Sequence, residues 1–324
     1  MLCKTILENG GQLYPLTLDF AKTNGTGIFN PSVYYDEQED RLYLNIRHCQ
    51  VTLYHTEASY FESFWGPLHY CHPENDMTLT TTNYFGELDT KTFGYKFISK
   101  VDTSKLDVKP IWSFVGLEDC RIVKWNDKIY ISGVRRDTTT NGEGRIELSE
   151  LEIKGSEVKE IARNRLQPPN HSYCEKNWMP IADKEWHYVK WCNPTEVVSV
   201  DLETNKAKTE FTGKQFWYPR DFRGGSQVIR LNDDYRFCCV HTVNLFSSEQ
   251  GRKNAIYRHC FIVWDNDWNL VKHTSEFSFL DAKIEFCAGM TKYKDDFLLT
   301  FGFQDNSSYL VKIPQDLMEK ICLG

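Results

Sequence analysis

Short stretches of alternating apolar and polar residues recur along the chain, and each is followed by a turn-forming cluster. Five times, such a stretch leads through a short acidic turn into an aromatic-rich stretch, and the five units start at Asn30, Glu118, Lys176, Gly224 and Phe286. The anchors of the second stretches lie 87, 58, 49 and 62 residues apart and are Tyr43, Tyr130, Tyr188, Phe237 and Leu299. A repeated strand–turn–strand unit predicts a stack or a ring of hairpins.

The spacing of these units predicts an all-β fold, a five-bladed β-propeller, because a four-stranded blade takes about 40–50 residues. Radial repetition also leaves only short, protected strand edges. Third strands are predicted over 195–200, 260–264 and 308–312, and a helical period appears only at 315–322. We expect one domain over residues 1–324, with blade hairpins near 28–50, 117–136, 175–193, 223–242 and 284–305.

Polar residues recur at two equivalent positions of every unit. The start of the first strand and the end of the second lie at the same end of an antiparallel hairpin. The starts carry Asn30, Glu118, Asp119, Glu175, Lys176, Asn177, Arg223, Ser226 and Glu285, and the ends carry Arg47, Arg135, Arg136, Asn193, His241 and Asp305. We therefore predict a central polar funnel on one face of the ring that binds a small polar ligand, and solvated turns on the other face.

A long segment, residues 54–115, separates the first two hairpins and is rich in aromatic residues. Long connections are usually functional or disordered. Two interpretations remain open: part of this segment forms a wall of the acceptor site, or it supplies the outer strands of the first blade.

Charge and composition limit the partners of the protein. The net charge is −7 without a run of lysine or arginine, so neither nucleic acid nor an anionic membrane is expected as a partner. No stretch approaches the ~20 apolar residues of a membrane span, and the N-terminus lacks the apolar run of a signal peptide. The 11 irregularly spaced cysteines predict reduced, buried side chains in a cytoplasmic protein.

Several kinds of chemistry lack their usual motifs. His69, Cys71 and His72 lie close together without a second pair of ligands at metal-binding spacing, so we expect no metal and no other cofactor. Ser226 does not lie in a Gly-x-Ser-x-Gly elbow, and no phosphate-cradling glycine loop of the Walker or dinucleotide type is present.

The remaining candidate chemistry consists of carboxylates, basic groups and aromatic walls. Asp119 follows Glu118 and precedes Arg121 by two residues, at the expected mouth of the funnel. The residues alone favour a turn-capping role for Asp119, but a carboxylate beside a glycosidic oxygen also serves as a general acid or base. Planar Asp, Asn and Arg side chains together with aromatic rings suit a carbohydrate ligand.

The second hairpin starts with the segment Gly116-Leu117-Glu118-Asp119-Cys120-Arg121-Ile122. In this segment the chain resembles glycoside hydrolase family 130, the β-mannoside phosphorylases, and the related propeller enzymes of glycosyltransferase family 108, because the family has Gly-Val-Glu-Asp-Pro-Arg-Ile there. Further similarity spans roughly residues 28 to 312 and includes Asn30-Pro31, Arg47, Glu175-Lys176-Asn177-Trp178-Met179-Pro180, Cys287-Ala288-Gly289 and Phe301-Gly302-Phe303-Gln304-Asp305. Cys120 stands where the family has proline, so the local backbone is expected to differ.

The resemblance implies inverting glycosyl transfer in a central sugar site. Asp119 matches the family's only catalytic carboxylate, which donates its proton through a sugar hydroxyl, and the resemblance thus favours a catalytic role over capping. Asn30, Arg47 and Asp305 match sugar-contacting positions, and the expected sugar-binding set adds Glu118, Asn177 and Glu285. The family's phosphate-binding cluster has no residue-by-residue match here. As phosphate- or donor-binding residues we expect Arg121, Lys176, Arg223, Ser226 and His241, while Arg135, Arg136 and Arg258 are expected to be structural.

The preferred hypothesis is a glycosyltransferase that uses a nucleotide sugar, with Asp119 as general base. The first alternative is a β-mannoside-type phosphorylase that uses inorganic phosphate, with Asp119 as general acid. An inverting hydrolase comes third, because it needs a second carboxylate, for which Glu118, Glu285 and Asp305 are candidates. A non-catalytic glycan-binding propeller is also open, since the fold alone implies no activity. The expected partners are a sugar donor, either a nucleotide sugar or a sugar 1-phosphate, and a saccharide acceptor.

Overall fold

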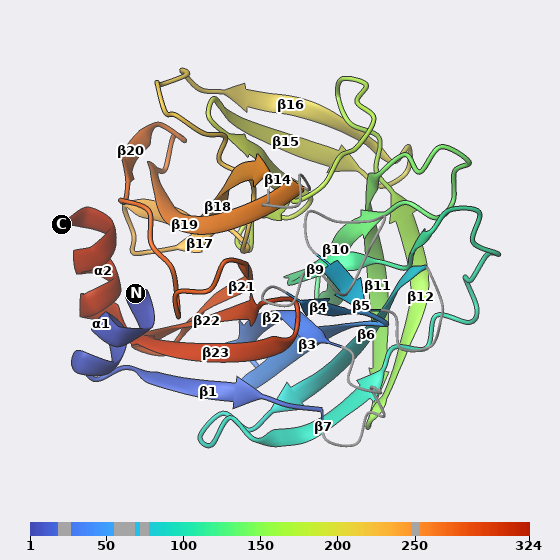
Figure 1. Cartoon of the computed structure of the whole chain (residues 1–324), viewed down its shortest axis with the longest axis horizontal. Coiled ribbons are helices and arrows are strands. Elements are labelled where there is room, and N and C mark those ends of the chain that lie inside the picture. Colours follow the sequence, from blue (N-terminus) through green and yellow to red (C-terminus); the bar gives the residue numbers. More distant parts are fainter. Residues whose placement is uncertain (19–26, 55–68, 72–77, 248–252) are drawn as a thin grey trace.

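The computed structural model describes residues 1–18, 27–54, 69–71, 78–247 and 253–324. Five sheets, each with four antiparallel strands in a row, are arranged in a ring (Figure 1). The innermost strands of the sheets are β2, β9, β13, β17 and β21. The predicted all-β, five-bladed β-propeller is therefore confirmed.

The blades follow the order of the chain. Blade 1 contains β2 (Ile28–Asp36), β3 (Arg41–Cys49), β6 (Leu79–Leu88) and β7 (Tyr95–Lys100), and the short β8 (Phe114–Val115) pairs with β6 in parallel. Blade 2 contains β9 (Glu118–Trp125), β10 (Lys128–Arg135), β11 (Arg145–Lys154) and β12 (Glu157–Arg165). Blade 3 contains β13 (Met179–Pro180), β14 (His187–Cys192), β15 (Thr195–Asp201) and β16 (Lys206–Thr212). Blade 4 contains β17 (Ile229–Arg230), β18 (Tyr235–Ser247), β19 (Lys253–Asp265) and β20 (Leu270–His273).

Blade 5 joins the two ends of the chain. It contains β21 (Glu285–Tyr293), β22 (Asp296–Phe303) and β23 (Ser307–Pro314), and its outermost strand is β1 (Gln12–Leu16) from the N-terminal region. Figure 1 shows blue β1 alongside red β23, and the register pairs Gln12 with Lys312 through Leu16 with Ser308. This pairing closes the ring, because the first and last parts of the chain share one sheet.

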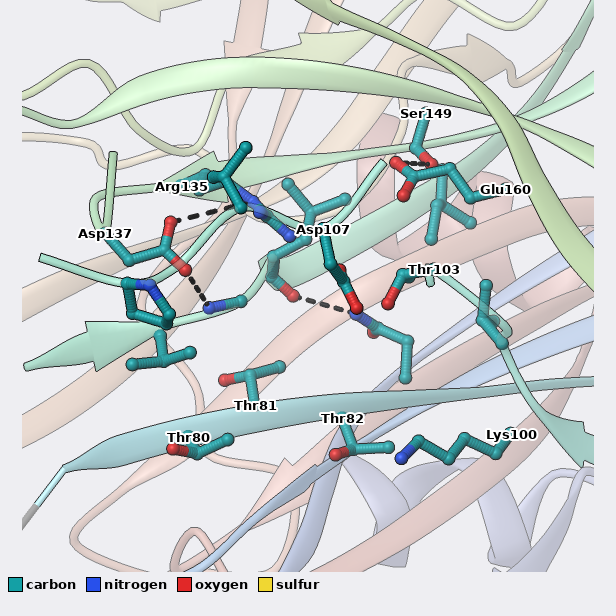
Figure 2. Close-up of a pocket in the computed structure, with 18 residues that line it drawn as sticks. Thr80, Thr81, Thr82, Lys100, Thr103, Asp107, Arg135, Asp137, Ser149 and Glu160 are labelled. Carbon is teal, nitrogen blue, oxygen red and sulfur yellow. Dashed lines mark hydrogen bonds and ion pairs between the residues drawn. The ribbon is translucent and has the colours of Figure 1, made fainter. Parts of the chain in front are cut away.

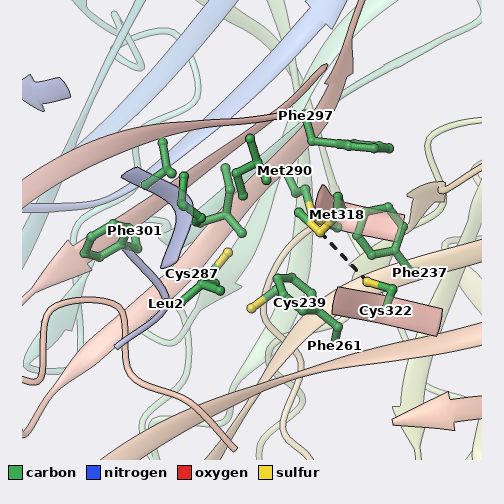
Figure 3. Packing of buried hydrophobic residues seen from close by; sticks show 14 of the residues in the cluster. Leu2, Phe237, Cys239, Phe261, Cys287, Met290, Phe297, Phe301, Met318 and Cys322 are labelled. Atoms are coloured by element: carbon green, nitrogen blue, oxygen red, sulfur yellow. Dashed lines mark hydrogen bonds between the residues drawn. The ribbon is translucent and has the colours of Figure 1, made fainter. Parts of the chain in front are cut away.

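A helix at each end of the chain packs against blades 4 and 5. The helix α2 (Gln315–Leu323) confirms the predicted C-terminal helix, but α1 (Leu2–Glu8) and β1 were not predicted. Leu2 of α1 and Met318 and Cys322 of α2 join a cluster of buried side chains that includes Phe237 and Phe297 (Figure 3). The seven residues of α1 are too few for a clear helical period, and the helix buries Leu2, Cys3 and Ile6 by this tertiary packing.

The long segment between the first two hairpins, residues 54–115, contains strands of blade 1 and part of a separate small sheet. Its strands β6 and β7 are the outer strands of blade 1, which supports that interpretation for residues 79–100. The aromatic residues at 60–65 lie outside the described residues, and β4 (Thr52–Tyr54) pairs with β5 (His69–Cys71) as a separate two-stranded sheet. Among the described residues, no helix is long and apolar enough to cross a membrane.

A buried glutamine connects the blades at the axis. Gln227 has no exposed surface, and its Nε2 donates to Ser32 Oγ at 3.2 Å, to the carbonyl of Val33 at 3.1 Å and to that of Ile122 at 2.8 Å. Its Oε1 accepts a hydrogen bond from the backbone N–H of Met290 at 2.8 Å. One side chain from blade 4 thereby forms hydrogen bonds with backbone groups of blades 1, 2 and 5, and it links the four blades near the axis.

Candidate active site

A cavity of about 190 Å³ opens at the axis, on the side where the first strands of the hairpins begin. It is smaller than a typical pocket for a drug-sized ligand, about 300–1,000 Å³. The residues that line it come from all five blades and include nine of the predicted site residues: Asn30, Arg47, Glu118, Asp119, Lys176, Asn177, Arg223, His241 and Asp305. The hairpin argument therefore places these side chains correctly; which of them bind sugar or phosphate stays a prediction.

Three predicted site residues lie outside the cavity. Glu285 has no exposed surface, and its carboxylate accepts hydrogen bonds from the backbone N–H groups of Phe279, Leu280 and Ala282. Side chains alternate along a strand, so the neighbouring Phe286 faces the cavity and Glu285 points away from it. The expected sugar-binding role of Glu285 is therefore wrong.

Ser226 and Arg121 are also structural in their contacts. Ser226 is fully buried, and its hydroxyl donates to the carbonyl of Gln227 and accepts from the N–H of Cys239. Arg121 is 1% exposed, and its guanidinium donates to the carbonyls of Gly225 and Asp119, both at 2.6 Å, and to Asn177 Oδ1 at 3.3 Å. Both residues support the floor of the cavity instead of lining it, which corrects the expected donor-binding roles.

The carboxylate of Asp119 is fixed by two other predicted site residues. Its Oδ1 accepts hydrogen bonds from Arg47 Nη1 and from Asn30 Nδ2, each at 2.8 Å. The Asp119 side chain keeps 21% of its surface exposed, and the Arg47 side chain keeps 9%. Arg47 also lies 3.6 Å from Glu118 Oε2 and is held from its far side by Thr81 Oγ1, which accepts from Arg47 Nε at 3.0 Å. Asp119 is thus held rigidly, yet it remains open to the cavity.

The backbone is locally irregular at both Asn30 and Asp119. Each lies in a β-bulge, where two residues face one on the partner strand, and each has a positive φ, 50° and 51°. Opposite the second bulge is Gly133, where an added Cβ would approach the carbonyl oxygen of Glu118 to 2.4 Å. Bulges redirect side chains and occur often next to active sites, and Asn and Asp tolerate the left-handed region better than most residues. Such strain inside a strand indicates a functional constraint.

The three carboxyl groups of the cavity differ in their pKa values. Burial acts to raise the pKa of Asp119, but Arg47, the hydrogen bond from Asn30 and the charge of Arg121 outweigh it, so the pKa lies below its ordinary value. Burial raises the pKa of Glu118, and Arg47 offsets this only in part. Burial, opposed by Arg47 and reinforced by Asp119 and Glu118, raises the pKa of Asp305 to about 6. At neutral pH, Asp119 is therefore the most firmly ionised of the three.

The cavity also contains a group of hydrogen-bond donors beside these carboxylates. Lys176 and Arg223 line the cavity, and neither side chain has a hydrogen-bond or ion-pair partner among the described residues. Burial and the charges of His259, Arg223 and Lys176 lower the pKa of His241 well below its ordinary value, so its imidazole is neutral at pH 7. The described residues offer no hydrogen-bond partner to the buried Nδ1 of His241. These groups leave donor capacity for an anion unfilled.

Tyr257 and the aromatic walls were missed from the sequence. Tyr257 lies on β19, the third strand of blade 4, and its ring stacks on His241 at a centroid distance of 5.3 Å. Burial raises the pKa of its phenol to about 12, so it acts as a neutral donor. Tyr257 reaches the cavity because β18 and β19 are unusually long: they pair from Tyr235–Asp265 to Ser247–Lys253 and bring a third strand to the cavity. Phe29, Phe114 and Phe286 supply aromatic surface.

The remaining basic candidates lie elsewhere. Arg136 donates to the carbonyl of Gly142 and to the Tyr173 hydroxyl, and Arg258 donates to the carbonyls of Tyr257 and Ala282. Arg135 lines a different cavity, and Asn193 bonds with the backbone of Phe216. Within the described part of the chain, no group of three or more His, Cys, Asp or Glu side chains is arranged to hold a metal ion.

Comparison with known proteins gives matches only among solved structures. No protein-family model matches the chain, and no curated protein matches it. A β-1,2-mannobiose phosphorylase from Listeria innocua, solved with β-1,2-mannobiose, has a TM-score of 0.52 at 10% identity and covers 96% of this chain and 99% of its own. A mannose phosphorylase from Leishmania mexicana, solved with a phosphate ion, has a TM-score of 0.50 at 14% identity, with 97% and 92% covered.

A third structure, a glycosidase described as putative from Bacteroides thetaiotaomicron, has a TM-score of 0.56 at 10% identity, with 89% and 87% covered. The expected resemblance to the propeller mannoside phosphorylases is thus confirmed for the fold. At these identities the likeness extends to the fold alone.

Proposed function

We propose that this protein is an enzyme that catalyses inverting glycosyl transfer between a sugar bearing a phosphate leaving group and the hydroxyl of a saccharide acceptor. The observation that carries the proposal is the lining of the cavity at the axis. It contains a rigid, ionised carboxylate, Asp119, together with two cations, Lys176 and Arg223, that have no ion-pair partner among the described residues. The similar folds of a mannose phosphorylase and a β-1,2-mannobiose phosphorylase favour mannose as the transferred sugar.

The cations and neutral donors suit the leaving group. When the bond between C1 and the phosphate oxygen breaks, the phosphate keeps the electron pair and gains negative charge. Lys176 and Arg223, with the neutral donors His241 and Tyr257, would stabilise that charge. Because these two cations have no carboxylate partner among the described side chains, an anion completes the arrangement without displacing an ion pair.

Asp119 suits the role of general base. The acceptor hydroxyl attacks C1 from the face opposite the phosphate, its oxygen forms the new glycosidic bond, and its proton passes to Asp119. The lowered pKa keeps Asp119 ionised and ready to accept that proton. In the reverse direction, phosphorolysis, the same residue returns the proton as general acid.

The identity of the donor is the finer part of the proposal. The sequence favours a nucleotide sugar, whereas the cavity of about 190 Å³ favours the smaller sugar 1-phosphate. We therefore propose mannose 1-phosphate as the first donor to test and GDP-mannose as the second.

The test is product formation from defined substrates. The protein is incubated with mannose and either mannose 1-phosphate or GDP-mannose, and the released phosphate or GDP and the mannobiose are measured. We expect equimolar release of phosphate and formation of a β-linked disaccharide from the α-linked donor. Product from GDP-mannose alone would move the proposal to the nucleotide-sugar reaction. Binding of mannose without turnover from either donor would overturn the enzymatic proposal in favour of a glycan-binding propeller.

A further inference from the structure

A second cavity, of about 320 Å³, lies between blades 1 and 2 and is larger than the one at the axis. Figure 2 shows its polar lining, which comes from β6, from the end of β7 and the connection that follows it, and from β10, β11, β12 and the connection after β10. Its polar side chains include Thr81, Thr82, Thr103, Arg135, Asp137 and Glu160. The function proposed above does not involve this second cavity.

The floor of the second cavity contains buried polar atoms without hydrogen bonds. Arg135 is 6% exposed and Asp137 is 2% exposed, yet Arg135 Nε and Asp137 Oδ1 form no hydrogen bond with any described residue. They lie 3.8 Å apart, and Arg135 Nε also lies 3.2 Å from Glu147 Oε2, so these charges attract one another without forming a hydrogen bond. Buried polar atoms usually find a partner in the protein or in a ligand or ordered water. A donor and an acceptor side by side can engage two neighbouring hydroxyl groups.

The charges of the lining favour a neutral ligand. The lining contains both Lys100 and Arg135 and the carboxylates Asp107, Asp137 and Glu160, so it carries charges of both signs. Glu160 is already satisfied by the Ser149 hydroxyl and Arg163. The threonine hydroxyls on the walls add groups that both donate and accept. This chemistry fits a small molecule with several hydroxyl groups, such as a monosaccharide or a cyclic polyol.

The second cavity also contacts the segment that carries Asp119. Asp137 Oδ2 accepts from the backbone N–H of Gly116 at 2.9 Å, and Asn83 Nδ2 donates to the carbonyl of Leu117 at 2.9 Å. Both residues line the second cavity, as does Thr81, whose hydroxyl accepts from Arg47. A ligand that orders these side chains therefore acts on the supports of both Asp119 and its arginine partner.

We propose that the cavity between blades 1 and 2 is a second binding site for a neutral, hydroxyl-rich ligand of monosaccharide size, and that its occupancy is coupled to the active site through residues 116–119. The binding half stands on this cavity alone. The coupling half rests on the proposed function, because it requires a glycosyl-transfer rate to be measured.

Binding is tested by calorimetric titration of the intact protein with methyl α-mannoside and, separately, with myo-inositol. The test variant carries Thr82→Val and Thr103→Val, which keep the volume and remove two hydroxyls. Thr212→Val, on exposed β16, is the matched control. We expect two binding events in the wild type and a loss of affinity of roughly tenfold or more for one event in the double variant, with no change in the control. Asn30→Ala should weaken the other event.

Unchanged titrations in the double variant, with a melting temperature equal to that of the wild type, would mean that the cavity holds only ordered water and would overturn the proposal. If the wild type shows no glycosyl transfer but binding in the second cavity persists in Asn30→Ala, the proposed function fails and the second site stands. For the coupling, saturating myo-inositol should change the transfer rate of the wild type at least twofold and leave the double variant unaffected. An equal response of both proteins would overturn the coupling.

Discussion

The two ends of the propeller axis are built by the same five hairpins, but their charges are compensated differently. At the turn end, a hollow of about 720 Å³ is lined by charges that pair with each other, such as Lys124 with Asp36 at 2.6 Å and Arg230 with Asp183 at 2.7 Å. At the cavity end, Glu118 and Asp119 share Arg47, and Lys176 and Arg223 have no ion-pair partner among the described residues.

This difference indicates which end of the axis is suited to bind a ligand. Charges that already pair with each other need no further partner from a ligand, and exposed pairs such as Arg230 with Asp183 contribute little to stability. Charges that stay uncompensated inside a cavity are costly for folding, and a bound ligand can supply the missing partners. The backbone follows the same division. Positive φ values at the turn end, as in Asn126 and Asp127, belong to tight turns, whereas Asn30 and Asp119 have them inside strands.

The largest expected effect separates the two ends by catalysis. Replacing Asp119 with Asn removes the base, so we expect the transfer rate to fall by about 10²–10⁴-fold while mannose still binds. Asp183→Asn at the turn end should change the rate less than about twofold, since surface changes away from a site have small effects. Initial rates and sugar titrations of both variants give the comparison. Equal losses in both variants would show that the two ends do not differ in function.

The next effect separates the ends by stability. Arg47→Met leaves Asp119 and Glu118 without their shared cation, and we expect a cost of about 3–5 kcal/mol in the free energy of unfolding. Arg230 is 42% exposed, so Arg230→Met should cost at most about 1 kcal/mol. Urea denaturation measures both values. If the costs of Arg47→Met and Arg230→Met differ by less than about 1 kcal/mol, the carboxylates at the cavity end do not depend on Arg47 more than an exposed pair depends on its cation.

A third change addresses the axis between the two ends. Gln227→Leu would leave the N–H of Met290 and the carbonyls of Val33 and Ile122 without their present partner, which should cost about 2–4 kcal/mol. The matched control is Gln38→Leu on the exposed turn of blade 1, which should stay within about 0.5 kcal/mol. Denaturation midpoints and slopes report both. An unchanged stability of Gln227→Leu would show that this side chain does not tie the blades together.

The smallest effect is a pH dependence at the cavity end. Asp305 has a pKa of about 6, so it is neutral at pH 5 and ionised at pH 7.5. Its negative charge should weaken the binding of sulfate, a dianion throughout this range, by a few-fold as the pH rises. The same raised pKa adds stability at low pH, which is lost as the pH rises through about 6.

Asp305→Asn should bind sulfate equally at pH 5 and pH 7.5, whereas Asp295→Asn at the turn end should keep the wild-type trend. Calorimetric titration at the two pH values measures this. Persistence of the full pH trend in Asp305→Asn would assign it to another group.

Much of this arrangement was predictable from the sequence. The repeated hairpin pattern and the Asn and Asp turn residues predicted the blades, and hairpin geometry brought Asn30, Asp119 and Asp305 to one end. Strand periodicity leaves the facing direction ambiguous where bulges intervene, so Glu285 was assigned to the cavity in place of Phe286. Helix α1 and strand β1 are short and depend on tertiary contacts, and the sequence alone carries little signal for them.

The roles of Gln227 and Tyr257 could not be predicted for a different reason. Gln227 acts through three blades that are distant in sequence, and its contacts exist only in the closed ring. Tyr257 reaches the cavity because β18 and β19 extend beyond the other strands of blade 4. Both depend on distances between blades, which a local pattern does not contain.

The most direct test of the central claim, that the uncompensated end of the axis is the ligand-binding end, is a crystal structure of the protein soaked with mannose and phosphate. We expect difference density for the sugar within hydrogen-bond distance of Asp119 and Arg47, and for the phosphate beside Lys176 and Arg223. Density for either ligand in the hollow at the turn end, with the axial cavity empty, would contradict it.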